Sequence, residues 1–244
     1  MSVPEKNRFS LMSQIAANII ALKQSLPPSV RLVAVSKTRP VTDIMEAYNT
    51  GQKCFGENRV QEILSKKDHL PADVEWHLIG HLQRNKIKLI VSFVSMIQSV
   101  DSLRLLSAID SEASKINRIV DILLQVHIAR EETKFGFNRE EIEAMMLSPE
   151  LKEFRFVRIC GLMGMATFTS DPGQVQLEFR SLAELFNDLK RKYFYADESF
   201  REISMGMSGD YDTAIKEGST IIRVGSLIFG ERALNQGVTL GSTE

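Results

Sequence analysis

Two kinds of hydrophobic pattern alternate along the chain. Short continuous apolar runs, such as "LVAV" at residues 32–35 and "DILLQV" at residues 121–126, are typical of strands buried on both faces. Between them, apolar residues recur every three or four positions, which is typical of amphipathic helices. The strands are predicted at 32–36, 53–57, 76–80, 95–99, 121–128, 154–162, 201–205 and 220–225. The helices are predicted at 41–49, 58–69, 83–92, 102–115, 138–148, 173–194 and 209–217.

A further helix is predicted before the first strand. Leu11, Ile15, Ile19 and Leu22 lie at helical spacing there. Eight strands that alternate with helices favour an α/β fold with a single (β/α)8 TIM barrel over residues 1–244 and an extra N-terminal helix. A doubly wound open sheet is the alternative. No linker or low-complexity segment divides the chain, so one domain is predicted.

Composition narrows the possible partners. A chain of 244 residues with 43% hydrophobic and 25% charged residues can bury a full core. Its net charge of -1 gives no general attraction to nucleic acid or to an anionic membrane, so neither is expected as a partner. The first residues lack a signal pattern and no apolar run approaches about 18 residues. Cys54 and Cys160 lie in strand-like runs, which favours reduced, buried thiols and a cytoplasmic location.

Lys37 follows the first predicted strand. Because side chains alternate along a strand, Val33, Val35 and Lys37 should share one face. In a barrel, the C-terminal ends of the strands form the active face. An amine held there above an apolar layer has a lowered pKa and can form a Schiff base. The alternative is a lysine that extends from the strand end into solvent.

Two segments near the end of the chain could bind a phosphate group. They read "ISMGMSGDYDT" at 203–213 and "IIRVGSLIFG" at 221–230, and they contain the loops after strands seven and eight, where barrels often hold phosphate. Ser208 is predicted to cap the helix that starts at Gly209, and Gly218 to end it. The candidate phosphate donors are the backbone N–H groups of Gly206, Gly209 and Gly225 and the hydroxyls of Ser204, Ser208 and Ser226.

Arg223 lies in the apolar run of the eighth strand. A buried arginine is rare without a partner, so it either forms a structural ion pair or donates to a bound ligand. A lysine for a Schiff base, a phosphate site and a fixed arginine together point to pyridoxal 5'-phosphate (PLP) as the cofactor. His77 and His81 share strand parity, but no cysteine or carboxylate stands near them at ligand spacing, so no metal site is expected. His81 is instead expected to line the barrel mouth, and the aromatic residues of "KFGF" at 134–137 are expected to pack in the core.

The segments "AVSKTRP", "CFGENRVQE", "WHLIGHLQRNK", "GLMGM" and "SMGMSGDYDTAIKEGSTIIRVGSLIFGER" resemble the pyridoxal phosphate homeostasis proteins over about residues 8–236. That family is similar to the barrel domain of alanine racemase, fold type III of the PLP enzymes. The resemblance implies that Lys37 holds PLP as an internal aldimine and that Arg223 faces the pyridine nitrogen. It also implies that Asn58 lies near the cofactor. The phosphate would be held by Ser204, Ser208, Gly225 and Ser226. Arg59 departs from the family pattern, which commonly has an aromatic residue there.

The function implied by the resemblance is intracellular vitamin B6 homeostasis, in which the protein supplies or buffers PLP. The implied partners are PLP itself and PLP-dependent apoenzymes, and the protein is expected to be a monomer or a weak dimer. A PLP-dependent amino-acid racemase or related enzyme is the alternative. Arg223 would favour an unprotonated pyridine nitrogen. An unprotonated PLP ring is a weaker electron sink than the pyridinium that a carboxylate partner would maintain. About fourteen residues follow Gly230, too few for the second domain that gives racemases a tyrosine base. A binding protein without catalytic turnover is therefore favoured.

A third possibility is a Schiff-base aldolase barrel that binds a sugar phosphate without a cofactor. Such an enzyme would need a lysine deeper on a later strand and an adjacent carboxylate for proton transfer, which the pattern does not provide.

Overall fold

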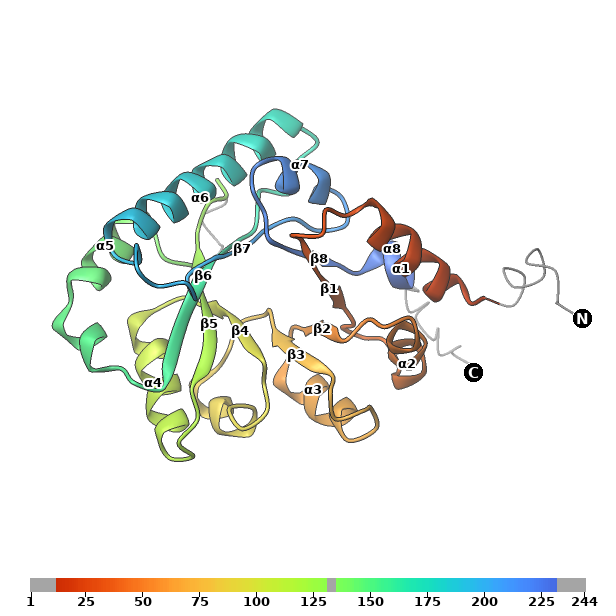
Figure 1. Ribbon diagram of the computed structural model, residues 1–244, viewed down its shortest axis with the longest axis horizontal. Helices are drawn as coiled ribbons and strands as arrows, with labels where there is room; N and C mark the ends of the chain where they lie inside the picture. The colour runs from red at the N-terminus through yellow and green to blue at the C-terminus, as the bar shows by residue number, and fades with distance from the viewer. Residues whose placement is uncertain (1–11, 131–134, 232–244) are drawn as a thin grey trace, which may run out of the picture.

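The computed structural model describes residues 12–130 and 135–231. Eight parallel strands pair in chain order, and the last returns to the first to close a barrel (Figure 1). The strands are β1 (Arg31–Val35), β2 (Cys54–Glu57), β3 (Glu75–Leu78), β4 (Met96–Val100), β5 (Val120–Val126), β6 (Val157–Gly164), β7 (Glu202–Ser204) and β8 (Ile221–Val224). The predicted barrel is confirmed, and the open-sheet alternative is wrong.

Helices connect consecutive strands, and further helices precede the first strand and follow the last. They are α1 (Gln14–Ser25), α2 (Val41–Asn49), α3 (Val60–Lys67), α4 (Leu103–Ser114), α5 (Arg139–Leu147), α6 (Pro172–Lys192), α7 (Tyr211–Lys216) and α8 (Ser226–Phe229). Among the described residues, two 3-10 segments are η3 (Arg84–Leu89) and η4 (Pro149–Glu153). The helix predicted at 83–92 is therefore a 3-10 turn, and η4 was not predicted.

The predicted N-terminal helix is present as α1. The Ser13 side chain caps it by accepting a hydrogen bond from the N–H of Ala16, and its apolar face buries Ile19 and Leu22. Burying two such side chains stabilises the fold by about 1.5–3 kcal/mol each. Asn18 Nδ2 donates to the carbonyl of Ile228 over 3.0 Å, so α1 lies against α8 (Figure 1). Leu11, which the prediction also used, lies outside the described residues.

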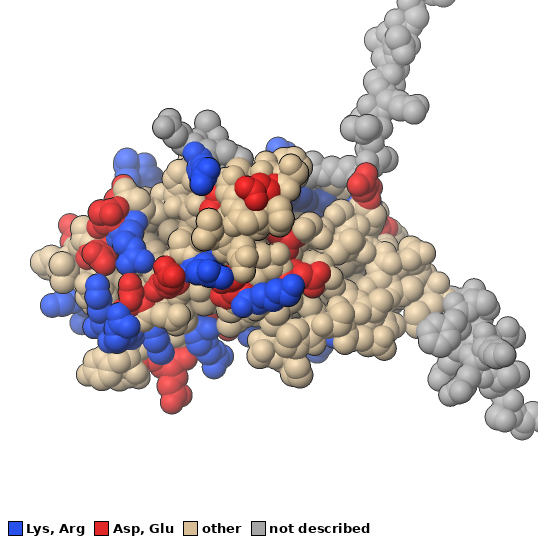
Figure 2. All heavy atoms as spheres, turned by 90° about the horizontal axis from the view of Figure 1, so that it is seen from above, with Lys and Arg blue, Asp and Glu red and all other residues tan. Residues whose placement is uncertain are grey.

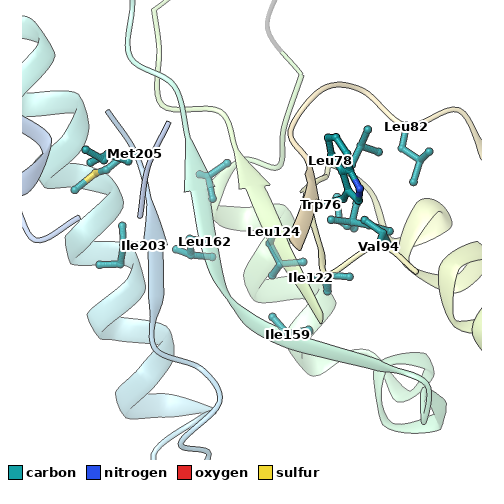
Figure 3. Close-up of a cluster of buried hydrophobic side chains, with 14 of the residues drawn as sticks. Trp76, Leu78, Leu82, Val94, Ile122, Leu124, Ile159, Leu162, Ile203 and Met205 are labelled. Carbon is teal, nitrogen blue, oxygen red and sulfur yellow. The ribbon is translucent and has the colours of Figure 1, made fainter. Parts of the chain in front are cut away.

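The hydrophobic core has two parts because strand side chains alternate between two faces. The larger part lies between the barrel and its helices, and Figure 3 shows members of it such as Trp76, Ile122 and Leu162. The smaller part fills the barrel interior and consists of Val33, Cys54, Met96, Leu123, Cys160, Met163 and Ile221. Both cysteines are buried free thiols, as predicted. Burial raises the pKa of Cys160 to about 12, so this thiol stays protonated at neutral pH.

Pairing of the first and last strands determines which loops meet. In the register of the sheet Val33 lies opposite Arg223, and Val35 lies opposite Gly56 on the other neighbour of β1. The strands are parallel, so the loops that follow β1, β2 and β8 reach the same end of the barrel.

The surface and the helices give two further observations. Figure 2 shows acidic and basic side chains interspersed over the face in view. In the part of the chain that the structure describes, no helix combines the length and the apolar character needed to cross a membrane.

Candidate functional site

A cavity of about 470 Å³ opens at the C-terminal end of the strands. Residues that line it include six of the eight predicted cofactor-binding residues, namely Lys37, Asn58, Ser208, Arg223, Gly225 and Ser226. Val35, Ile79 and Met165 give it an apolar wall. The cavity therefore combines a lysine, an arginine and hydroxyl groups beside an apolar surface, as the sequence predicted for this end of the barrel.

Lys37 is carried by a tight turn directly after β1. The N–H of Ser36 donates to the carbonyl of Gly56 over 3.0 Å, and the N–H of Arg39 closes the turn by donating to the carbonyl of Ser36 over 3.0 Å. Thr38 has φ of 65°, in the left-handed region that the third residue of a type II turn requires and that usually favours glycine. Lys37 thus lies in a turn whose backbone is constrained on both sides.

A buried ionic cluster contacts this turn at Ser36. Glu57 is 0% exposed and Lys66 is 7% exposed. Glu57 Oε1 accepts from Lys66 Nζ over 2.8 Å and from Ser36 Oγ over 2.6 Å. Among buried side-chain polar atoms of the described residues, Glu57 Oε2 is the one without a hydrogen-bond partner. Burial raises the pKa of Glu57, although its bonds to Lys66 and Ser36 act in the opposite direction.

Arg223 lies at the floor of the cavity and is 4% exposed. Its Nη1 donates to Ser204 Oγ over 2.7 Å, and its Nη2 donates to the carbonyl of Gly164 over 3.0 Å. These partners are a hydroxyl and a carbonyl oxygen, so they are not the structural ion pair that the sequence left open. Burial lowers the pKa of Arg223 to about 10, and the carboxylate of Asp210 partly offsets that effect. The guanidinium therefore stays protonated at neutral pH and presents only donors.

Ser204 extends this network into the barrel interior. Its hydroxyl donates to Gln98 Oε1 over 2.6 Å, and Gln98 Nε2 lies 2.8 Å from His77 Nδ1. Burial, with a smaller contribution from the charge of Arg31, lowers the pKa of His77 to about 3, so a neutral ring can accept this bond. Ser204 is 0% exposed and contacts Arg223 beneath the cavity instead of lining it. This observation disfavours the direct phosphate contact that the resemblance implied for Ser204.

The two predicted phosphate loops contact one another. Ser208 Oγ accepts a hydrogen bond from the N–H of Gly225 over 3.3 Å. The prediction that Ser208 caps a helix from Gly209 is wrong, because α7 begins at Tyr211 and Asp210 occupies the cap position. The Asp210 carboxylate instead accepts from the N–H of Met207 over 2.5 Å and also lines the cavity. Burial raises the pKa of Asp210, while its hydrogen bond from Met207 and the charge of Arg223 act in the opposite direction.

Gly206 shapes its loop without lining the cavity. It has φ of 95°, and a β-carbon at this position would lie 2.6 Å from the β-carbon of Ala214. A residue with a side chain would therefore push the loop away from α7.

Of two rings at the mouth, His81 was expected there from the sequence, whereas Phe135 was expected only to pack. His81 Nδ1 lies 3.1 Å from Asp101 Oδ2, and its ring stacks on Phe135 with centroids 4.9 Å apart. His81 and Phe135 both line the cavity. The position of His81 after the third strand was the signal for that prediction, and no comparable signal marked Phe135.

The sequence of this chain is similar to proteins of a known family. The family model for the alanine racemase N-terminal domain matches residues 12–233. A pyridoxal phosphate homeostasis protein from Synechocystis is 41% identical over 210 residues, which cover 85% of this chain and 94% of that protein. A protein of the same name from Aquifex aeolicus is 42% identical over 203 residues, covering 83% of this chain and 87% of that one. The chain belongs to the pyridoxal phosphate homeostasis protein family.

Solved structures place this family member among barrels of the same fold. PipY of Synechococcus elongatus without PLP has a TM-score of 0.83 and 38% identity, and covers 88% of this chain and 100% of its own. PipY with PLP bound has a TM-score of 0.81 at the same identity and coverage. An alanine racemase from Clostridium difficile has a TM-score of 0.70 at 12% identity, with coverage of 91% of this chain and 57% of its own. At that identity the likeness concerns the fold alone.

Proposed function

We propose that this chain binds PLP, carried covalently on Lys37, and takes part in intracellular vitamin B6 homeostasis by supplying or buffering the cofactor. The observation that carries the proposal is that Lys37, Arg223 and the two serine-bearing loops line a single cavity. The names of the homologues and the PipY structure with PLP bound support it.

The donors in the cavity fit the chemical groups of PLP. A phosphate group accepts hydrogen bonds, and Ser208 and Ser226 offer hydroxyl donors beside the backbone of Gly209 and Gly225. Arg223 has only donors, which suits an unprotonated pyridine nitrogen. The apolar wall of Val35, Ile79 and Met165 suits the face of an aromatic ring.

Lys37 is the proposed covalent attachment point. When bound, PLP offers an aldehyde, which a primary amine converts to a C=N bond with loss of one water molecule. The amine must be neutral to attack the aldehyde carbon, so the nitrogen has to give up a proton before the bond forms. The Ser36 to Arg39 turn holds the backbone of Lys37, while the serine loops and Arg223 would hold the other end of the cofactor.

PLP-dependent apoenzymes are the proposed recipients of the cofactor, and the cytoplasm is the proposed location. Two buried free thiols suit a reducing compartment. The prediction of a monomer or a weak dimer stands as part of this proposal.

A PLP-dependent racemase is the alternative function. Racemisation requires proton transfer on both faces of the substrate α-carbon. With Arg223 at the ring nitrogen, a carbanion at the substrate α-carbon would be less stabilised than with a carboxylate at that nitrogen. We therefore expect amino acids incubated with the loaded protein in D2O to show no racemisation at about 1 per second or faster. Racemisation at that rate, lost in Lys37→Ala, would establish the enzyme instead.

The direct test is chemical trapping of the cofactor. The purified full-length protein, loaded with PLP, should show a visible absorption band that borohydride removes. Peptide mapping should then find the cofactor on the peptide that contains Lys37. Lys53→Ala, an exposed lysine paired with Asp73, is the matched control and should label as the wild type does. Labelling at another lysine, or a protein that PLP cannot colour, would overturn the proposal.

A further inference from the structure

Two side chains of α3, Glu62 and Lys66, hold the turn that carries Lys37. On one side of Lys37, the carbonyl of Ser36 accepts from Lys66 Nζ over 2.9 Å. On the other side, the N–H of Thr38 donates to Glu62 Oε2 over 2.7 Å. Lys66 Nζ also lies 3.4 Å from Glu62 Oε2, which joins the two contacts. The backbone on both sides of Lys37 is therefore held by one charged pair.

The contact at Thr38 has a specific conformational role. Thr38 is β-branched, and its φ of 65° lies in a region that such residues rarely adopt. A carboxylate that accepts the Thr38 N–H favours this conformation through a charge-assisted hydrogen bond. Burial alone would raise the pKa of Glu62, but the Thr38 N–H and Lys66 outweigh it, and the pKa lies below its ordinary value. Glu62 is therefore ionised at neutral pH and can keep this contact.

The neighbouring residue Lys67 shows that the arrangement is particular to Lys66. Lys67 pairs with the exposed Asp68 over 2.5 Å and lies over the ring of Phe93, away from the turn. Lys66, one position earlier on α3, is directed to Glu57, Glu62 and the Ser36 carbonyl. Adjacent lysines on one helix therefore make different contacts, and Lys67 is a suitable control.

We propose that Glu62, together with Lys66, is a positioning residue that holds the Lys37 turn in its binding conformation before PLP arrives. The inference rests on the proposed function, because it assigns to α3 a role in presenting the amine. Glu62 itself touches the backbone of the turn and does not line the cavity.

The first test is Glu62→Ala, which removes the acceptor of the Thr38 N–H. In the cofactor-free protein, hydrogen exchange of the Thr38 amide should become faster, as measured by NMR. The rate at which added PLP becomes fixed by borohydride should fall about tenfold, the effect of losing one charge-assisted hydrogen bond. Lys67→Met should change neither quantity. Glu62→Gln keeps an acceptor oxygen without the charge and should give a smaller loss, which preserves the test if Glu62→Ala does not fold.

The second test is a rescue that a general loss of structure would not show. Thr38→Gly removes the β-carbon, so the left-handed conformation no longer needs the carboxylate. Added to Glu62→Ala, or to Glu62→Gln if Glu62→Ala does not fold, it should restore the fixation rate to within about threefold of the wild type.

The outcomes separate this inference from the proposed function. Wild-type fixation rates in both Glu62 variants, or a reduced rate that Thr38→Gly does not restore, would overturn the positioning role. Absence of borohydride-fixed PLP on Lys37 in the wild type would overturn the proposed function itself.

Discussion

Replacing Lys66 with methionine should destabilise the protein in a pH-dependent way. The substitution keeps a long side chain but leaves Glu57, which is 0% exposed, without the amine that lies 2.8 Å from its Oε1. Breaking a buried pair by removing one partner costs about 3–5 kcal/mol, because the remaining charge is uncompensated. For a chain of this size each kcal/mol corresponds to about 2–4 °C, so we expect the melting temperature to fall by about 10 °C at pH 8.

The pH dependence follows from the pKa of Glu57. Burial already raises this pKa in the wild type, while Lys66 opposes the rise through its hydrogen bond and its charge. Without Lys66 the folded-state pKa of Glu57 rises further above its unfolded value. The penalty is then fully present above the folded pKa, shrinks as the pH falls through it, and is absent below the unfolded pKa of about 4.3. The stability deficit of Lys66→Met should therefore be smaller at pH 5 than at pH 8, by about 1.4 kcal/mol per pH unit in that window.

Urea unfolding followed by circular dichroism at pH 8 and pH 5 measures both effects. Lys67→Met, which removes a lysine paired with an exposed carboxylate, should change the free energy of unfolding by less than about 1 kcal/mol. Adding Glu57→Gln to Lys66→Met removes the buried charge and should recover most of the loss. An equal deficit at both pH values, or a double variant as unstable as Lys66→Met, would refute the argument.

Three further variants test the cavity. Lys37→Ala should abolish borohydride-fixed PLP yet leave binding that equilibrium dialysis detects, because the serine loops do not depend on the lysine; complete loss of binding would contradict their role. Ser208→Ala with Ser226→Ala should lower PLP affinity about tenfold or more with Lys37 intact, since each hydroxyl contributes about 1 kcal/mol. An unchanged affinity in a fluorescence titration would exclude these hydroxyls as ligands. Gly80→Ala should weaken PLP binding and lower the melting temperature, because a β-carbon would lie 2.4 Å from the Asn58 carbonyl oxygen. If neither quantity changes, the rim of the cavity adapts to the methyl group.

The barrel was predictable because its strands are buried on both faces and therefore form apolar runs that stand out between amphipathic helices. All eight predicted strands overlap observed ones. Local capping was less predictable. Ser208 has the side chain of a helix cap, but its hydroxyl is taken by the Gly225 N–H of another loop, and α7 begins three residues later. That contact depends on the pairing of β7 with β8, which a local pattern does not contain.

The cavity residues were predictable to different extents. Lys37 and Ser226 follow strand ends directly, so their place at the barrel mouth follows from the topology. Ser204 also faces the barrel interior, but it lies beneath the cavity, where it contacts Arg223. The role of Lys66 could not be predicted from the sequence, because Lys66 and Lys67 are adjacent lysines on one helix. The structure shows that the end of β1 approaches Lys66.

Closure of the barrel between β1 and β8 has a consequence for synthesis of the protein. Lys37 is translated early, whereas Arg223, Gly225 and Ser226 emerge from the ribosome near the end of the described chain. The register of Val33 opposite Arg223 unites these groups only when the last strand has paired with the first. Domains fold as units during and after translation. A nascent chain that lacks β8 therefore has the Lys37 amine but lacks the cavity residues that β8 and the loop after it supply. Tight retention of a cofactor in this cavity therefore reports that the whole barrel has been completed.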